Sequence, residues 1–165
     1  MSWASLQPGL RHTLTLRVDS SLIVPAVSET FSGFRDMPPV FATAFMVGYI
    51  EWACIEALRP HLAPGERTVG THINVSHIAA TTVGMNVVAE IELVAVEGRK
   101  LQFEVECRDD AEIIGAGTHE RVVIDLARFL TRMDEKAAKR VGNSRPPFGQ
   151  NRPHSSDPQI SAKQL

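Results

Sequence analysis

Glu51 is the residue in this sequence whose surroundings point most directly to chemistry. It is the only charged side chain between Met37 and Ile55, and its neighbours are Ile50 and Trp52. A carboxylate is rarely found inside an apolar helix unless it is paired, hydrogen-bonded or functional. A partly dehydrated carboxylate is well suited to act as a general base or a nucleophile. The alternative interpretation is structural, with Glu51 marking one solvated stripe of an amphipathic helix.

His77 is a second candidate, because the pattern of residues 71–77 turns it inward. The period of two in this segment separates two faces, with Thr71, Ile73, Val75 and His77 on one and His72, Asn74 and Ser76 on the other. The apolar members indicate that the first face points to the core. Since His72 and His77 lie on opposite faces, they cannot bind one metal ion as a strand pair. An inward histidine is often an ordinary hydrogen-bonded core residue, but an inward Glu51 that could meet it favours a catalytic role.

Thr43 is a third candidate. It precedes Glu51 by eight residues, which is about 80° around an α-helix, so both side chains could line one cavity. Taken alone, Thr43 is most simply a helix N-cap. A threonine near free helix amides is also well placed to bind an oxyanion or to activate a water molecule.

The last predicted strand carries two glycines and an arginine. Gly115 and Gly117 interrupt this strand, which indicates either a bulge or a close approach between two backbones. Arg121 follows them and is either a surface charge or a contact for an anion.

The elements that must position these residues follow an α+β order. We expect a strand at 12–18, a long loop at 19–40, an apolar helix from Thr43 to about residue 62, strands at 68–79, 86–97, 100–108 and 112–126, and a short helix at 127–141. No helix separates the later strands, so the predicted fold is a curled antiparallel sheet wrapped around one helix. The core face of the 86–97 strand is predicted to hold Val87, Ala89, Ile91, Leu93 and Ala95. In the 100–108 strand, Leu101, Phe103, Val105 and Cys107 oppose Gln102, Glu104 and Glu106.

The chain is expected to form one domain at 12–141, with a short extension at 1–11 and a disordered tail at 142–165. The tail is rich in Asn, Ser, Pro, Gln and Arg, a composition that does not form a core. The loop at 19–40 carries Phe31, Phe34 and Met37, and its length suits a lid as well as an ordinary anchored connection.

Composition excludes several classes of function. A net charge of −2 over 165 residues argues against a nucleic-acid binder, and a hydrophobic content of 44% is enough for a proper core. The 37–55 run begins with two prolines and contains Gly48 and Glu51, so we expect no membrane span. Cys54 and Cys107 form neither a close pair nor a metal-ligand spacing, and we expect two buried free thiols, no metal and no signal peptide. The predicted location is therefore the cytoplasm.

Several segments together match one family in order and spacing. They are residues 40–54, 64–66, 70–71, 75–81, 96–99 and 114–121, and the similarity covers roughly residues 12–130. In these segments the chain resembles the fluoroacetyl-CoA thioesterase group of hotdog-fold enzymes. The resemblance implies a hotdog fold, a homodimer with active sites at the subunit interface, and hydrolysis of an acyl-CoA thioester. It implies no cofactor, since coenzyme A is part of the substrate.

The resemblance also assigns roles to individual residues. The family's catalytic residues fall on Thr43, Glu51 and His77, and its substrate-contacting glycine and arginine fall on Gly70 and Arg121. The family also has a pair of lid phenylalanines. In this chain Phe34 stands at the first of these positions and Met37 at the second. Because methionine is flexible, the resemblance implies a short-chain acyl-CoA thioesterase and leaves open the preference for a fluoroacetyl group.

Two other functions remain as alternatives. A hotdog enoyl-CoA hydratase or dehydratase would share the fold, but these enzymes usually carry an Asp/His pair that is placed differently. A non-catalytic acyl-CoA binding module would keep Gly70 and Arg121 and would need no buried base. The combination of Thr43, Glu51 and His77 favours hydrolysis over both.

Overall fold

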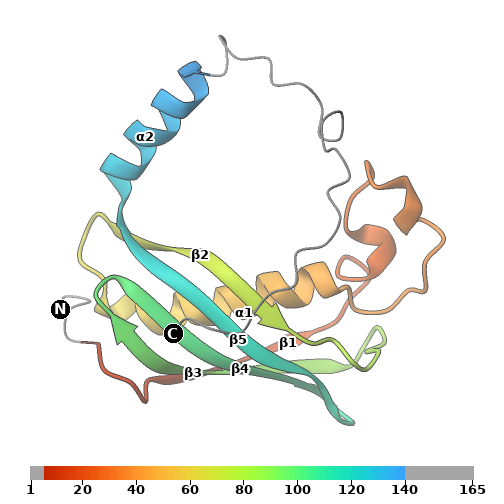
Figure 1. Ribbon diagram of the computed structural model, residues 1–165. Coiled ribbons are helices and arrows are strands. Elements are labelled where there is room, and N and C mark those ends of the chain that lie inside the picture. The colour runs from red at the N-terminus through yellow and green to blue at the C-terminus, as the bar shows by residue number, and fades with distance from the viewer. Residues whose placement is uncertain (1–5, 140–165) are drawn as a thin grey trace, which may run out of the picture. The chain divides into compact units, whose positions relative to one another are not determined.

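The computed structural model describes residues 6–139, which form one five-stranded antiparallel sheet and two α-helices (Figure 1). The strands in spatial order are β1 (Arg11–Arg17), β3 (Asn86–Glu97), β4 (Lys100–Asp109), β5 (Ile113–Asp125) and β2 (Glu66–Val75). The helices are α1 (Thr43–Leu58) and α2 (Leu126–Lys139), with short 3₁₀ helices η2 (Val24–Ala26), η3 (Ser32–Phe34) and η4 (Arg59–His61). The predicted α+β fold, with its antiparallel sheet and central helix, is confirmed.

Consecutive hairpins build the middle of the sheet. β3 joins β4 through a tight turn in which Gly98 has a φ of 57°, a left-handed conformation that glycine adopts without strain. The chain between β1 and β2 includes α1, and these two strands end at opposite edges of the sheet. Strand β2, which carries Gly70, therefore pairs only with β5 within the part of the chain described here.

The core lies between α1 and one face of the sheet. On α1 the buried residues are Met46, Tyr49, Ile50, Ala53, Cys54, Ala57 and Leu58, and they belong to one cluster with the inward residues of β3 and β4. Burial of each large apolar side chain contributes about 1.5–3 kcal/mol relative to exposure. Residues 6–139 do not cover the opposite side of α1, where Ala44, Gly48 and Trp52 form an exposed apolar stripe.

Most predicted boundaries hold within a few residues. α1 ends at Leu58 and η4 continues to His61, where a helix to about residue 62 was expected. β2 ends at Val75, but backbone pairing with β5 extends to the N–H groups of Ser76 and Ile78, which bind Ala116 O and Ile114 O. The predicted second helix is confirmed up to residue 139. The predicted tail and residues 1–5 of the N-terminal extension lie outside the described residues.

Two face predictions are wrong, and a β-bulge explains each one. The β3–β4 register shifts between Leu93 and Ala95, so Val96 rather than Ala95 packs against the core. The β2–β5 register shifts between Gly70 and His72, so Thr71 is exposed instead of sharing the inner face with Ile73. The predicted alternation in β4 is confirmed, with Leu101, Phe103, Val105 and Cys107 buried.

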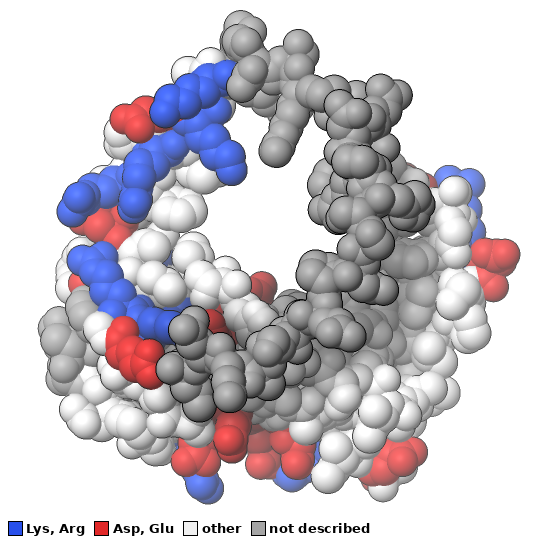
Figure 2. Space-filling view, viewed as in Figure 1, with Lys and Arg blue, Asp and Glu red and all other residues white. Residues whose placement is uncertain are grey.

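The chain divides into two compact units, residues 1–129 and 130–165. Helix α2 runs across this boundary and is amphipathic, with Leu130 and Met133 on an exposed apolar side and Lys136 and Lys139 in its last turn. Figure 2 shows Lys and Arg side chains gathered along this helix. No helix among residues 6–139 is long and apolar enough to cross a membrane.

Candidate active site

Glu51 lies in the middle of α1 and faces the two strands β2 and β5. Its Oε1 atom accepts a hydrogen bond of 3.4 Å from Arg121 Nη1, and its side chain is 41% exposed. A Cβ atom at Gly70 would overlap Glu51 Oε1, so only glycine leaves room for the carboxylate here. The apolar helix therefore carries a carboxylate that is paired on one side and open to solvent on the other.

Arg121 is buried, with only 2% of its surface exposed. Its Nε and Nη2 atoms donate to Oγ1 and O of Thr68 at 3.0 Å, and its Nη1 donates to His119 Nε2 at 3.0 Å. Burial lowers the pKa of the Arg121 guanidinium, and the charge of Glu51 opposes that shift. A guanidinium stays protonated in proteins, so the carboxylate faces a fixed positive charge.

His119 also belongs to this cluster, and it lies two residues before Arg121 on the same face of β5. Its ring is 2% exposed, its Nδ1 lies 2.8 Å from His72 O, and its Nε2 lies 3.8 Å from Glu51 Oε1. Burial is the main cause that lowers the pKa of the His119 imidazole. A neutral imidazole forms no ion pair, so the proximity of His119 to Glu51 is a packing contact and not a salt bridge.

Thr43 and His77 form a second group at the start of α1. Thr43 Oγ1 and His77 Nδ1 are joined by a hydrogen bond of 2.8 Å. The structure places the N-cap at Ala42 and shows no side-chain cap, so the simple interpretation of Thr43 as N-cap is wrong. The Thr43 hydroxyl binds His77 instead, and no side chain among residues 6–139 caps the first amides of α1.

His77 is partly buried beside Phe41, with ring centroids 6.3 Å apart. Burial lowers the pKa of the His77 imidazole, so this ring is neutral near pH 7 and can accept a proton there. Its Nε2 atom is buried and has no hydrogen-bond partner in the described structure. Such an atom is costly to leave unpaired unless a ligand or water reaches it.

The predicted site residues thus fall into two groups. Glu51, Gly70 and Arg121 come together, as do Thr43 and His77, and no hydrogen bond or ion pair joins the groups within residues 6–139. Eight residues of helix separate Thr43 from Glu51 by about 12 Å along the axis. A molecule that contacts both groups must therefore be extended along α1.

The predicted lid residues lie in the long loop before α1, beside the N-terminal end of that helix (Figure 1). The loop is anchored at its ends by hydrogen bonds of 2.9 Å from Val24 N to Val40 O and 3.0 Å from Ala42 N to Leu22 O. Phe34 is partly buried and packs edge-on against Phe31 at 5.7 Å, whereas Met37 is 47% exposed.

Gly115 and Gly117 permit a close approach between two backbones, one of the two alternatives that the sequence left open. A Cβ at Gly115 would overlap Ser76 O, and a Cβ at Gly117 would overlap Asn74 O. The two glycines therefore bring β5 close to the end of β2, just before the position of His77.

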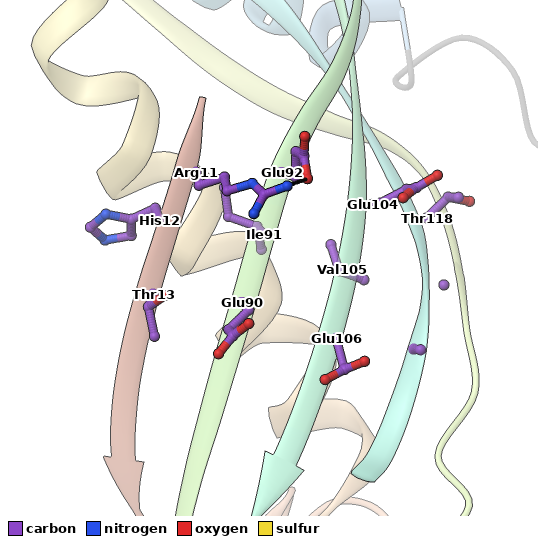
Figure 3. Close-up of a pocket in the computed structure, with 12 residues that line it drawn as sticks. Arg11, His12, Thr13, Glu90, Ile91, Glu92, Glu104, Val105, Glu106 and Thr118 are labelled. Carbon is purple, nitrogen blue, oxygen red and sulfur yellow. Dashed lines mark ion pairs between the residues drawn. The ribbon is translucent and has the colours of Figure 1, made fainter. Parts of the chain in front are cut away.

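An outward pocket is lined by acidic side chains and by none of the predicted catalytic or substrate-binding residues. It has a volume of about 450 Å³ and lies on the face of the sheet opposite α1, where Glu90, Glu92, Glu104 and Glu106 gather (Figure 3). Two of them are ion-paired, Glu92 with Arg11 at 2.7 Å and Glu90 with Arg108 at 2.5 Å, which leaves the charges of Glu104 and Glu106. An acidic pocket of this kind repels a polyanion such as coenzyme A.

A second pocket, of about 430 Å³, adjoins the Glu51 cluster. It is lined by Ile55, Arg59, Leu62, Ala63, Pro64, Arg67 and Thr68. Thr68, which binds Arg121, is the residue through which this pocket touches the Glu51 cluster. Its two arginines favour an anionic ligand, although Glu56 pairs with Arg59 at 2.6 Å.

Sequence reasoning missed His119 and Thr68. The signal for His119 was its spacing of two from Arg121, which places both side chains on one face of a strand. Thr68 could be found only from the pairing of β2 with β5. Among residues 6–139 no group of three His, Cys, Asp or Glu side chains could hold a metal ion.

Comparison with solved structures defines the class of protein. A hot-dog-like protein from Thermanaerovibrio acidaminovorans matches with a TM-score of 0.67 at 22% identity, over 78% of this chain and 91% of that one. A crystal structure of the fluoroacetyl-CoA thioesterase FlK matches with a TM-score of 0.78 at 42% identity, over 80% of this chain and 98% of that one. The fold is therefore the hotdog fold of thioesterases.

Sequence comparison gives the family. The fluoroacetyl-CoA thioesterase of Streptantibioticus cattleyicolor is 50% identical over 103 residues, which are 62% of this chain and 74% of that protein. Residues 26–127 match the family of fluoroacetyl-CoA-specific thioesterases. The chain belongs to this family, and the predicted class of enzyme, a thioester hydrolase, is confirmed.

Proposed function

We propose that this chain hydrolyses a short-chain acyl-CoA thioester to the free acid and coenzyme A, with Thr43, Glu51 and His77 as catalytic residues. The observation that carries the proposal is Glu51, a half-exposed carboxylate on an apolar helix, whose Oε1 is held by the buried Arg121. A carboxylate, a hydroxyl, an imidazole and backbone amides can together supply every step of the hydrolysis. The reaction therefore needs no cofactor beyond the coenzyme A of the substrate.

Glu51 begins the reaction in one of two ways. It attacks the thioester carbonyl and forms an anhydride that water then hydrolyses, or it removes a proton from a water molecule that attacks the carbonyl directly. In both routes the C–S bond breaks, the thiolate of coenzyme A leaves, and a proton from water finally reaches the sulfur.

Thr43 and His77 assist at the other end of the site. Because about 12 Å of helix separates Thr43 from Glu51 in one chain, the Thr43 hydroxyl, already paired with His77, reaches the group that Glu51 attacks if the two residues come from different subunits of the homodimer proposed below. The neutral His77 ring can orient water and carry the proton to the leaving sulfur. The uncapped amides at the start of α1 are suited to stabilise the oxyanion, as is the backbone of Gly70.

Substrate binding is proposed to involve Gly70, Arg121, Phe34 and Met37. Arg121 supplies fixed positive charge next to Glu51, and Phe34 and Met37 face the acyl end from the lid. The pocket at Arg67 and Thr68 suits the anionic coenzyme A better than the acidic outer pocket does. Whether Met37 preserves selectivity for a fluoroacetyl group is tested by the panel described below.

We further propose a cytoplasmic homodimer with active sites at the subunit interface. The stripe of Ala44, Gly48 and Trp52 lies on the same helix as Glu51, is apolar, and is exposed in the single chain, with Trp52 at 48%. Two free, buried thiols suit a reducing compartment. Burial raises the pKa of Cys54 and Cys107 to about 12, so both stay protonated thiols at neutral pH. Light scattering of the wild type and of Trp52→Glu tests the dimer. A monomeric wild type would refute it.

The first experiment measures thiol release, with a thiol-reactive dye, from acetyl-, fluoroacetyl-, propionyl- and phenylacetyl-CoA. We expect turnover by the wild type and its loss in Glu51→Gln, which keeps the shape of the side chain but removes its basicity. No turnover with any ester, or full activity in Glu51→Gln, would refute the proposal. A strong bias toward fluoroacetyl-CoA would show that Met37 preserves the lid, whereas a broad profile would show that it does not.

A single turnover in ¹⁸O-labelled water tests the direct-water route. Direct attack by water places label only in the released acid, so label in the Glu51 carboxylate would refute this route and establish the anhydride.

A further inference from the structure

His119 is a buried titratable residue that the proposed mechanism does not use. It lies on β5 opposite Ile73 of β2 and Phe103 of β4, and only 2% of its surface is exposed. Three charged side chains act on it electrostatically, namely Arg121, Glu51 and Glu120. A histidine in such surroundings is either an acid–base group, a positioning residue or a passive part of the core.

The two ring nitrogens show which tautomer is present. Nδ1 lies 2.8 Å from His72 O, and because a carbonyl oxygen only accepts, Nδ1 must carry the hydrogen. Nε2 lies 3.0 Å from Arg121 Nη1, and because a guanidinium only donates, Nε2 must be the acceptor. His119 is therefore a neutral imidazole with both nitrogens engaged by the protein.

This geometry excludes direct proton transfer between His119 and Glu51. Both facing atoms, His119 Nε2 and Glu51 Oε1, are acceptors, and they lie 3.8 Å apart. The lone pair of Nε2 is already occupied by Arg121, and the ring is closed to solvent. A role in catalysis must therefore act through Arg121.

A continuous chain of hydrogen bonds links the backbone of β2 to the carboxylate. His72 O accepts from His119 Nδ1, His119 Nε2 accepts from Arg121 Nη1, and the same Nη1 donates to Glu51 Oε1 at 3.4 Å. Thr68 fixes the other two nitrogens of the guanidinium. Without the His119 acceptor, Nη1 would keep a single protein partner, the half-exposed Glu51.

We propose that His119 is a positioning residue, which holds the Arg121 guanidinium against Glu51 Oε1 and so fixes the direction in which the other carboxylate oxygen meets the substrate. The inference rests on the proposed function, in which Glu51 reacts. Displacement of a reacting group by about 1 Å can lower the rate about 100-fold, so a loose guanidinium has a measurable cost.

The test compares two substitutions at this position. His119→Gln keeps an acceptor oxygen near Nη1, whereas His119→Phe fills the space and offers no acceptor. We expect His119→Phe to lower kcat by about 30- to 100-fold with KM changed less than about 3-fold, and His119→Gln to recover most of kcat. His12→Phe is the control. It makes the same replacement at a partly buried histidine of β1, the edge strand on the far side of the sheet from β2.

Thermal unfolding gives the folded fraction of each variant, so kcat can be expressed per folded molecule. A loss of positioning is then distinguished from a loss of folding. Wild-type kcat in His119→Phe, or equal losses of kcat in both His119 variants, would overturn the inference. The proposed function fails on different results, namely an inactive wild type or an active Glu51→Gln. An inactive Glu51→Gln together with a fully active His119→Phe would refute the role of His119 alone.

Discussion

The two halves of the candidate site are built in opposite ways. Glu51 is surrounded by Gly70, His119 and Arg121, and the arginine makes four hydrogen bonds to the protein. Thr43 and His77 share one hydrogen bond, and Thr43 is exposed. One half is fixed before substrate arrives, while the other has free hydrogen-bonding capacity at His77 Nε2 and at the first amides of α1.

This difference suggests a division of labour. Electrostatic stabilisation is strongest where charges are held in place and need not reorganise during the reaction, which describes the Glu51 cluster. Proton transfer needs groups that substrate and water can reach, which describes Thr43 and His77. Substitutions in the first half should act by moving a carboxylate, and those in the second by deleting a contact with substrate.

The largest effect is expected from Gly70→Ala. The added methyl group would overlap Glu51 Oε1 and would lie 3.1 Å from Cε1 of the buried His119 ring. The Glu51 carboxylate is the end of a flexible, half-exposed side chain, so it is the group that moves most while the fold survives. We expect kcat/KM to fall by about 100-fold or more, with little change in the melting temperature. Steady-state kinetics and thermal unfolding measure the two quantities.

Gly48→Ala adds the same methyl group where a Cβ meets nothing within 4 Å in the single chain. It controls for stability only, because Gly48 belongs to the stripe proposed as the dimer interface, and it should raise the free energy of unfolding by up to about 1 kcal/mol through helix propensity. If Gly70→Ala retained wild-type activity, the tight packing around Glu51 would have no catalytic role.

A smaller effect is expected from Thr43→Val, which removes the hydroxyl that binds His77. We expect kcat to fall by about 10- to 100-fold, the usual range for the loss of one proton-transfer partner. The free energy of unfolding should change by at most about 1 kcal/mol, because the hydrogen bond is exposed. Thr43→Ser keeps a hydroxyl and should recover most of the rate in a thiol-release assay. A fully active Thr43→Val would remove Thr43 from the mechanism.

Arg67→Gln and Arg11→Gln compare the two pockets. Arg67 lines the pocket next to the Glu51 cluster, and Arg11 lines the acidic outer pocket. If coenzyme A binds at the first pocket, Arg67→Gln should raise KM by about 3- to 10-fold with kcat unchanged, consistent with one lost charge contact of about 1 kcal/mol. Arg11→Gln should leave KM as it is. The opposite pattern would move the coenzyme A site to the outer face.

Local sequence patterns predicted the parts of the fold that repeat regularly. The alternation in β4 and the apolar run of α1 identified the core, and the single charge in that run identified Glu51. Thr71 and Ala95 were placed on the wrong face because a β-bulge adds one residue. Gly70 stands at the first bulge, whereas no glycine or proline marks the second. The period of two is correct on each side of a bulge and fails across it.

The partners of Glu51 depend on contacts far apart in the sequence. Residues 115–121 contain no alternating apolar positions, so the inner face that holds His119 and Arg121 was not apparent from the pattern. The hydrogen bonds to Thr68 and His72 follow from the register of β5 against β2. The pairing of Thr43 with His77 likewise required the end of β2 to lie beside the start of α1.

The smallest predicted effect is on stability below neutral pH. Burial lowers the pKa of both His77 and His119 from the ordinary value of 6.5, so the unfolded chain binds these protons first as the pH falls. The two neutral rings therefore make their full contribution to the free energy of unfolding above about pH 6.5. This contribution decreases as the pH falls toward their folded-state pKa values. We expect the melting temperature to be lower at about pH 5.5 than at about pH 7.5, and His119→Gln to reduce this difference more than His61→Gln, which replaces a histidine in η4. An equal pH dependence in the wild type and His119→Gln would show that the buried ring of the Glu51 cluster does not resist protonation, and the contrast between the two halves of the site would then rest on hydrogen bonding alone.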